Sequence, residues 1–138
     1  MKHIHFLHRE QLPVPGSQAK AVRYPTCEWR APTGDATDAA HHPWNRFVCS
    51  WLTSDMADVA HCDEVLQAMA QIEAGTRETW FVDGNAFNVD LQATGVQFNP
   101  SNVGPEDTAY WNQAQGRFTL TEVQAVLRLW RDFLAQSR

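Results

Sequence analysis

Hydrophobic and polar residues alternate along several short stretches in the first half of the chain, a pattern typical of strands. Residues 3–8 form the first such stretch. Residues 20–24 predict a second strand, which Pro25 is expected to end or bend because proline lacks a backbone N–H. Residues 46–52 alternate most strongly and predict a third strand.

The second half of the chain predicts a meander of three strands. Residues 78–82 and 86–91 flank Asp83-Gly84, and an Asp-Gly pair between two alternating segments is a strong hairpin signal. Apolar and polar residues alternate through 86–91, so we expect a sheet with one buried and one solvent-facing side. Thr94-Gly95 predicts a further turn, and residues 96–98 extend the meander.

Apolar residues spaced three and four apart predict two helices. The first is expected over residues 61–74, with Gly75 placed as a C-terminal glycine stop. The second begins at Thr119, which forms a capping box with Glu122, and continues to about residue 134. In a capping box, the two side chains satisfy N–H groups that have no partner within the helix.

The predicted element order is therefore β-β-β-α-β-β-β-α. This order indicates an α+β fold of two layers, with a mainly antiparallel sheet of about five to six strands and two helices. We expect residues 1–138 to form a single domain, because that length suffices for one hydrophobic core. Residues 30–45 are expected to form an exposed loop between two strands.

Four segments of the chain occur in an order found in a known family: Phe6-Leu7-His8-Arg9-Glu10, Asp63-Glu64-Val65, the hairpin Thr79-Trp80-Phe81-Val82-Asp83-Gly84, and the closing helix from Val123 to Leu134. In this layout the chain resembles the small YacL-type proteins of bacteria. That family is uncharacterised, so the resemblance implies an element order and no catalytic residues. More loosely, the chain is similar in type to immunity proteins that neutralise contact-dependent growth inhibition toxins, which are often small, acidic and cytosolic.

Negative charge is concentrated in the middle of the chain. Residues 53–112 contain ten carboxylates and a single cation, Arg77, although the whole chain has a net charge of only −5. A nucleic-acid surface needs clustered Lys and Arg, so nucleic acid is not the expected partner. An acidic region of this kind can steer a basic partner, but it can also be a solvated surface that keeps the protein soluble.

Two aromatic residues, Tyr110 and Trp111, follow Glu106 and Asp107 in a stretch without strand or helix pattern. Aromatic side chains supply much of the binding energy at protein interfaces, and neighbouring acids speed association with a basic partner. The alternative is that both rings cover one end of the sheet. We take as candidate partner-binding residues Asp55, Asp58, Asp63, Glu64, Asp83, Asp90, Glu106, Asp107, Tyr110 and Trp111.

Few residues suggest catalysis or metal binding. His3 and His5 share one side of a strand, but a metal site needs three or four ligands and no others have suitable spacing. Cys62 lies between His61 and Asp63, yet adjacent helical residues do not face each other, so a small buried cysteine is the simpler interpretation. Phosphate-binding glycine loops and hydrolase motifs are missing. We therefore expect no enzyme activity, metal or cofactor.

Cysteine usage and the first residues bear on location. The three cysteines, Cys27, Cys49 and Cys62, are widely spaced and form no CxxC pair, which favours reduced thiols in the cytoplasm. Histidines interrupt the apolar residues at the start of the chain, so a signal peptide is not expected. Apolar runs are also too short to span a membrane.

The leading hypothesis is an immunity protein that binds and neutralises a cognate bacterial toxin, expected to be a basic nuclease, through an acidic surface. Its acidic side chains would occlude the nucleic-acid groove of the toxin. The alternative hypothesis is a housekeeping α+β protein that binds a small ligand or self-associates.

Overall fold

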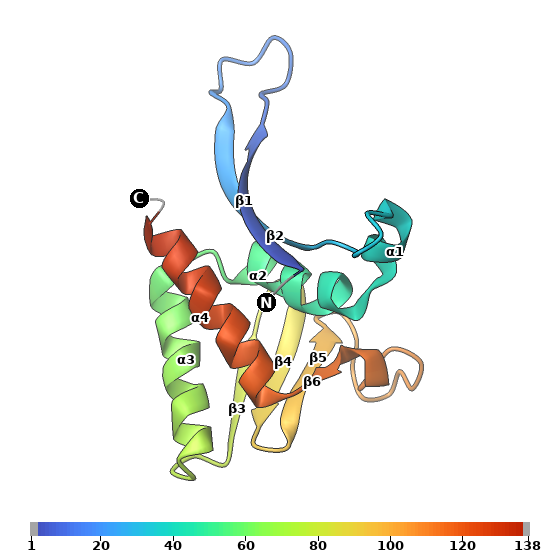
Figure 1. Ribbon diagram of the computed structural model, residues 1–138, viewed down its shortest axis with the longest axis vertical. Coiled ribbons are helices and arrows are strands. Elements are labelled where there is room, and N and C mark those ends of the chain that lie inside the picture. Colours follow the sequence, from blue (N-terminus) through green and yellow to red (C-terminus); the bar gives the residue numbers. More distant parts are fainter. Residues whose placement is uncertain (1–2, 137–138) are drawn as a thin grey trace.

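The computed structural model describes residues 3–136 and has the α+β architecture that was expected (Figure 1). In chain order the elements are β1 (Ile4–Gln11), β2 (Val22–Trp29), α1 (Ala36–His41), a π-helix (Trp44–Cys49), α2 (Ser50–Asp55), α3 (Val59–Glu73), β3 (Thr79–Asp83), β4 (Phe87–Gln92), β5 (Gly95–Pro100), a 3₁₀ turn (Ala114–Gly116), β6 (Arg117–Phe118) and α4 (Leu120–Gln136). The strands form two antiparallel sheets, and there are four α-helices where two were expected.

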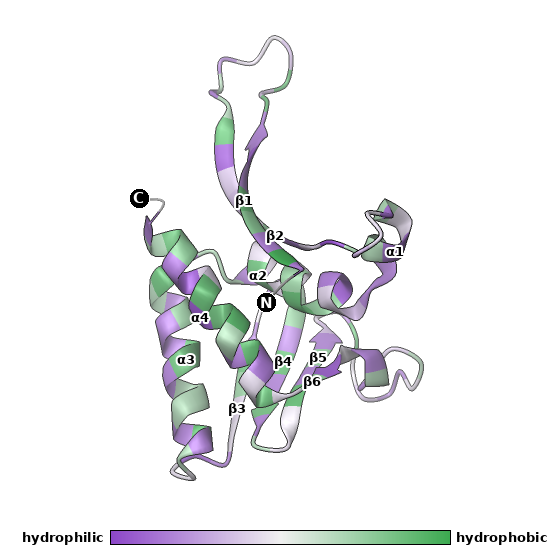
Figure 2. Cartoon of the chain, in the orientation of Figure 1, coloured by the Kyte–Doolittle hydropathy of each residue, from purple (hydrophilic) through white to green (hydrophobic). Residues whose placement is uncertain are grey.

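The larger sheet is a meander in the order β3-β4-β5-β6. Both predicted turns are present, since Asp83 pairs with Asn88 across the first hairpin and Gln92 pairs with Gly95 across the second. Helices α3 and α4 lie side by side over one face of this sheet (Figure 1). Apolar and polar residues follow one another along both helices (Figure 2), and the buried residues of each helix fall three and four positions apart, which gives an apolar stripe.

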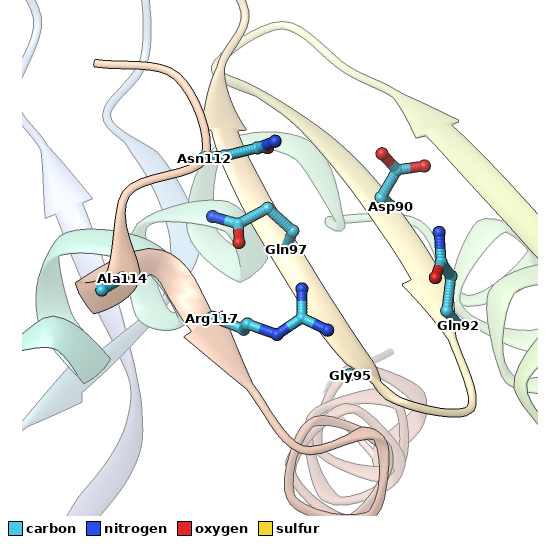
Figure 3. A pocket seen from close by; sticks show the side chains of 7 residues that line it. All are labelled: Asp90, Gln92, Gly95, Gln97, Asn112, Ala114 and Arg117. Atoms are coloured by element: carbon cyan, nitrogen blue, oxygen red, sulfur yellow. The ribbon is translucent and has the colours of Figure 1, made fainter. Parts of the chain in front are cut away.

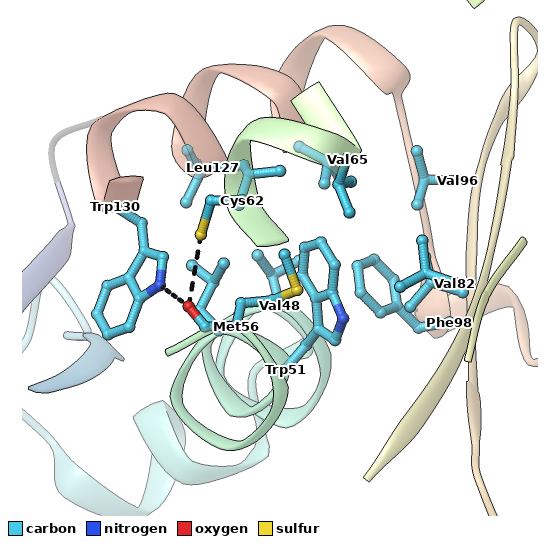
Figure 4. Packing of buried hydrophobic residues seen from close by; sticks show 14 of the residues in the cluster. Val48, Trp51, Met56, Cys62, Val65, Val82, Val96, Phe98, Leu127 and Trp130 are labelled. Atoms are coloured by element: carbon cyan, nitrogen blue, oxygen red, sulfur yellow. Dashed lines mark hydrogen bonds between the residues drawn. The ribbon is translucent and has the colours of Figure 1, made fainter. Parts of the chain in front are cut away.

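The hydrophobic core lies between this helical layer and the sheet. Val82, Val96 and Phe98 point from the strands toward α2, α3 and α4 (Figure 4). The predicted stripe of the last helix is confirmed, and its buried members include Leu120, Val123, Leu127, Trp130 and Leu134.

The prediction of a strand over residues 46–52 is wrong. This segment is helical, first as the π-helix and then as α2. Phe47, Val48, Cys49, Trp51 and Leu52 are all buried. A short helix buried on nearly every side has no polar face to reveal its period, so its residues can also be read as an alternating strand.

The expectation of an unstructured loop over residues 30–45 is also wrong in its second half. Asp35 caps α1, because its carboxylate accepts hydrogen bonds from the N–H groups of Thr37 and Asp38. The π-helix then begins at Trp44. α1 contains no buried residue, so this part of the excursion is exposed as expected.

The remaining two strands form a hairpin that projects from the body of the molecule (Figure 1). The second strand begins at Val22, but it continues through Pro25 to Trp29 instead of ending at the proline. A backbone hydrogen bond from Arg30 N–H to the His3 carbonyl fixes the pairing pattern. In this pattern residue 25 directs its backbone nitrogen away from β1, so proline removes no bond between the strands.

Candidate functional site

One face of the four-stranded sheet is not covered by helices. Because side chains alternate along each strand, the residues opposite the core-facing ones point away from α3 and α4. We call this side the open face; its outward residues are Thr79, Phe81, Asp83, Asn88, Asp90, Gln92, Gly95, Gln97, Asn99 and Arg117. Phe81, Asp90, Gln97 and Arg117 follow one another in a row across the four strands.

A hollow of about 410 Å³ runs along the open face between β4 and the loop of residues 101–113 (Figure 3). We call it the sheet groove. Its lining is rich in amides and holds one charge of each sign; the lining residues are Asp90, Gln92, Gly95, Gln97, Asn112, Ala114 and Arg117. Side-chain amides both donate and accept hydrogen bonds, so such a lining can bind polar groups of a partner, including main-chain amides.

Buried amides hold the wall of the sheet groove in place. Asn99 is 2% exposed, and its side chain donates to Asn112 Oδ1 at 3.0 Å and accepts from the Asn112 N–H at 2.7 Å. Gln97, 6% exposed, donates to the Gln113 carbonyl at 3.0 Å. Asn112 has a φ of 52°, a conformation that asparagine adopts more readily than most residues. These bonds fix the end of the loop against β5.

The two charged groups of the sheet groove are not neutralised by each other or by other described residues. Within residues 3–136, neither Asp90 nor Arg117 belongs to an ion pair. The Arg117 guanidinium lies over Gly95 and donates to the Thr94 carbonyl at 3.3 Å. A Cβ at position 95 would come within 3.0 Å of this guanidinium, so glycine keeps the space that the arginine occupies.

Asn88 adds an unsatisfied acceptor to the open face. Its side-chain oxygen is buried and has no hydrogen-bond partner among the described residues. Asn88 pairs with Asp83 on one side and with Asn99 on the other. A buried acceptor without a partner costs about 1–3 kcal/mol, so this position is not optimised for stability.

Six of the predicted binding residues lie on this side of the molecule or in its loop. Asp83 and Asp90 are on the open face, and Glu106, Asp107, Tyr110 and Trp111 are in the loop of residues 101–113. Asp107 accepts hydrogen bonds from the N–H groups of Ala109 and Tyr110, which shapes the loop tip. Tyr110 is 59% exposed, whereas Trp111 is half-buried.

The other four predicted binding residues belong to the helical layer. Asp55 accepts hydrogen bonds from the N–H groups of Ala86 and Phe87 and so fixes the hairpin between β3 and β4. Asp58 caps α3. Asp63 forms an ion pair with Arg131 of α4, and Glu64 is exposed on α3. The ten residues therefore do not form one continuous surface.

Gln92, Gln97, Asn112 and Arg117 line the sheet groove but were not among the predicted site residues. The alternation that identified a solvent-facing side at Asp90 continues to Gln92, so this residue could have been found. The same holds for Gln97, which lies between Val96 and Phe98 and pairs with Asp90. The place of Arg117 could not be predicted, because it depends on the pairing of β5 with β6, which is only two residues long.

The structure also bears on metal binding and on the reactivity of Cys62. In residues 3–136, no group of three His, Cys, Asp or Glu side chains has an arrangement that could hold a metal ion. Cys62 is fully buried, and its thiol lies 3.5 Å from the Met56 carbonyl oxygen. Burial raises the pKa of the Cys62 thiol to about 12, so it remains a thiol near neutral pH and is a poor nucleophile.

The fold and site together define an α+β protein with an antiparallel sheet that helices cover on one face only. None of the helices in residues 3–136 has the length and apolar character required to cross a membrane. Comparisons with protein-family models, characterised proteins and solved structures found no match.

Proposed function

We propose that the protein binds a basic protein partner on the open face of its sheet. The observation that carries this proposal is the charge of that face. The outward positions of the sheet and the loop of residues 101–113 contain four carboxylates, Asp83, Asp90, Glu106 and Asp107, and one cation, Arg117. Complementary charge raises the association rate and disfavours partners of the wrong sign.

Two exposed aromatic side chains, one on the sheet and one in the loop, are available to anchor a partner. Phe81 is 52% exposed next to Asp90, and Tyr110 is 59% exposed in the loop. Aromatic residues supply a large share of the binding energy at interfaces when a partner buries them. The amides of the sheet groove would then fix the orientation of the partner.

The specific form that we favour is an immunity protein whose partner is a basic nuclease toxin. A nuclease binds phosphates through clustered Lys and Arg, so its active-site groove attracts an acidic surface. Docking of the open face over that groove would exclude the nucleic acid. The similarity in type to immunity proteins supports this form.

The test is co-purification of the tagged protein with the product of the gene immediately upstream, at low and high salt, followed by stopped-flow measurement of the association rate of the purified pair. Asp83→Lys/Asp90→Lys reverses two charges on the open face. Glu73→Lys/Glu78→Lys makes the same charge change on exposed positions at the end of α3 and just before β3, outside the candidate binding residues, and serves as the matched control. We expect the first variant to slow association by about 10-fold to 100-fold and the control by less than about threefold. Equal effects of the two variants would exclude the open face as the binding site.

Exposed apolar residues on the hairpin favour self-association as a second candidate. Leu12 and Val14 are 76% and 74% exposed near the hairpin tip, and Val22 is 58% exposed. Light scattering tests this function directly. A monomer across the concentration range would rule it out, and a dimer lost in Leu12→Ser/Val14→Ser would support it.

A further inference from the structure

Two of the three cysteines lie in contact although they are far apart in sequence. Cys27 belongs to β2 and Cys49 ends the π-helix, and their Sγ atoms are 2.8 Å apart. A disulfide bond measures about 2.05 Å, so a displacement of less than about 1 Å would bring the two sulfurs to bonding distance. From this geometry we propose that Cys27 and Cys49 form a dithiol–disulfide pair that fastens the hairpin to the body of the molecule.

Hydrogen bonds at Cys27 and at Trp29 anchor β2 beside Cys49. The Cys27 N–H donates to Thr53 Oγ1 at 3.0 Å. Two residues further along β2, the Trp29 N–H donates to Asn45 Oδ1 at 2.7 Å, and Asn45 Nδ2 donates back to the Trp29 carbonyl at 2.6 Å. β2 is therefore anchored to the helical segment that carries Cys49, and the fold already holds the two thiols in contact.

A small oxidant can reach this pair. Both cysteines line a surface hollow of about 420 Å³, whose walls also include Arg9, Asn45, Ser50 and Thr53. Cys27 is 8% exposed and Cys49 is 1% exposed, so Cys27 is the more accessible of the two. The hydrogen bond to Cys49 and burial raise the pKa of the Cys27 thiol, so we expect the reaction to be slow in the folded state.

The oxidant is a peroxide of small size. The Cys27 thiol loses its proton, its sulfur attacks one peroxide oxygen, and the O–O bond breaks to give a sulfenic acid and water. The Cys49 thiol then loses its proton, and its sulfur attacks the sulfenic sulfur, forms the S–S bond and releases a second water. Overall, two thiols are oxidised to one disulfide while the peroxide is reduced to two water molecules.

Cys62 provides an internal control. Its side chain is fully buried in the core, and its thiol contacts the Met56 carbonyl oxygen and not another cysteine (Figure 4). Oxidation of the folded chain should therefore leave it reduced. A general reaction of all thiols would instead modify all three residues.

The experiment treats the purified full-length chain with hydrogen peroxide, then unfolds it and alkylates the remaining thiols. We expect peptide mapping to give one linked pair, Cys27 with Cys49, and alkylated Cys62. The link should form in Cys62→Ala and be lost in Cys27→Ser and Cys49→Ser. Oxidation should raise the urea midpoint of the wild-type chain and leave that of Cys49→Ser unchanged, because a cross-link restricts the unfolded chain.

Three results would overturn the proposal. The first is that Cys27 and Cys49 both remain free to react with the alkylating agent. The second is that they are oxidised to sulfinic or sulfonic acids without a link. The third is a link that involves Cys62 or a second chain. Because the wild-type peptide map decides among these results, the test stands even if a serine variant does not fold.

Discussion

At the scale of single residues, the buried tryptophans differ in one bond. Trp51 and Trp130 are both fully buried in the same core. The indole N–H of Trp130 donates to the Met56 carbonyl at 2.7 Å (Figure 4). The indole N–H of Trp51 has no hydrogen-bond partner among the described residues. The pair therefore separates the contribution of ring volume from that of a buried hydrogen bond.

Replacement of each tryptophan by phenylalanine removes a similar volume but only one hydrogen bond. We expect Trp130→Phe to lower the free energy of unfolding by about 1–2 kcal/mol more than Trp51→Phe, because only the first leaves the Met56 carbonyl without its N–H donor. Urea unfolding followed by circular dichroism measures both. Equal losses would mean that the indole bond adds nothing to stability.

Ionisation of the Cys62 thiol should lower the free energy of unfolding at alkaline pH. Burial raises its pKa from 9.0 to about 12, so the thiol ionises in the unfolded chain at a lower pH than in the folded chain. The free energy of unfolding is unaffected by this thiol below about pH 9. Between about pH 9 and pH 12 it falls by up to about 1.4 kcal/mol for each pH unit. The urea midpoint of the wild-type chain should fall as the pH is raised from 8. The midpoint of Cys62→Ala should fall less steeply with pH. Parallel slopes would contradict the assignment to Cys62.

At the scale of elements, the helix ends show how local sequence sets the fold. Asp58 caps α3 through the Ala60 N–H, and α3 buries five residues in the core. At its other end, Gly75 has a φ of 77°, and backbone bonds from residues 75 and 76 to Ile72 and Gln71 close the last turn. Asp35 caps α1 in the same way as Asp58 caps α3, but α1 buries nothing.

This contrast predicts different costs for the same change. Asp58→Ala should lower the free energy of unfolding by about 1 kcal/mol, since it weakens a helix that forms part of the core. Asp35→Ala should change it by less than about 0.3 kcal/mol, because α1 can unfold locally without exposing the core. A similar loss in both variants would show that α1 unfolds together with the rest of the chain.

Elements with strong local signals could be predicted from the sequence, and those fixed by distant partners could not. The hairpin at Asp83-Gly84 and the last helix are confirmed; Thr119 Oγ1 accepts from the Glu122 N–H at 3.1 Å. The helix over residues 46–52 was not predicted because it is buried on nearly every side, and β6 was not predicted because two residues carry no pattern. The sheet groove was missed in part for the same reason: its residues from β5, β6 and the loop meet only through strand pairing.

At the scale of the whole molecule, the chain consists of a body and a projecting hairpin (Figure 1). β1 packs against the body through aromatic contacts with α4. The ring of Phe6 lies 5.4 Å from that of Trp130 and 5.6 Å from that of Phe133. Beyond the last pair of the hairpin, Gln11 with Val22, the residues are exposed or half-buried and lie outside the core.

The tip of the hairpin should therefore be dispensable for folding. We expect a variant with Asn-Gly in place of residues 12–21 to keep its free energy of unfolding within about 0.5 kcal/mol of the wild-type value. Phe6→Ala, at the base of the same hairpin, should lower it by about 2–3 kcal/mol because two ring contacts are lost. A large loss on shortening would mean that the tip contributes to stability of the native fold.

The projecting hairpin has a consequence for how the chain could be divided. The fully buried core residues all follow position 26, and β1 reaches them through backbone pairing with β2 and the ring of Phe6. A cut within residues 12–21 would turn β1 into a short separate peptide that faces a preformed docking strand. The first strand thus behaves as a ligand tethered to its own receptor, and a split version of the protein should reassemble when this peptide is supplied in trans.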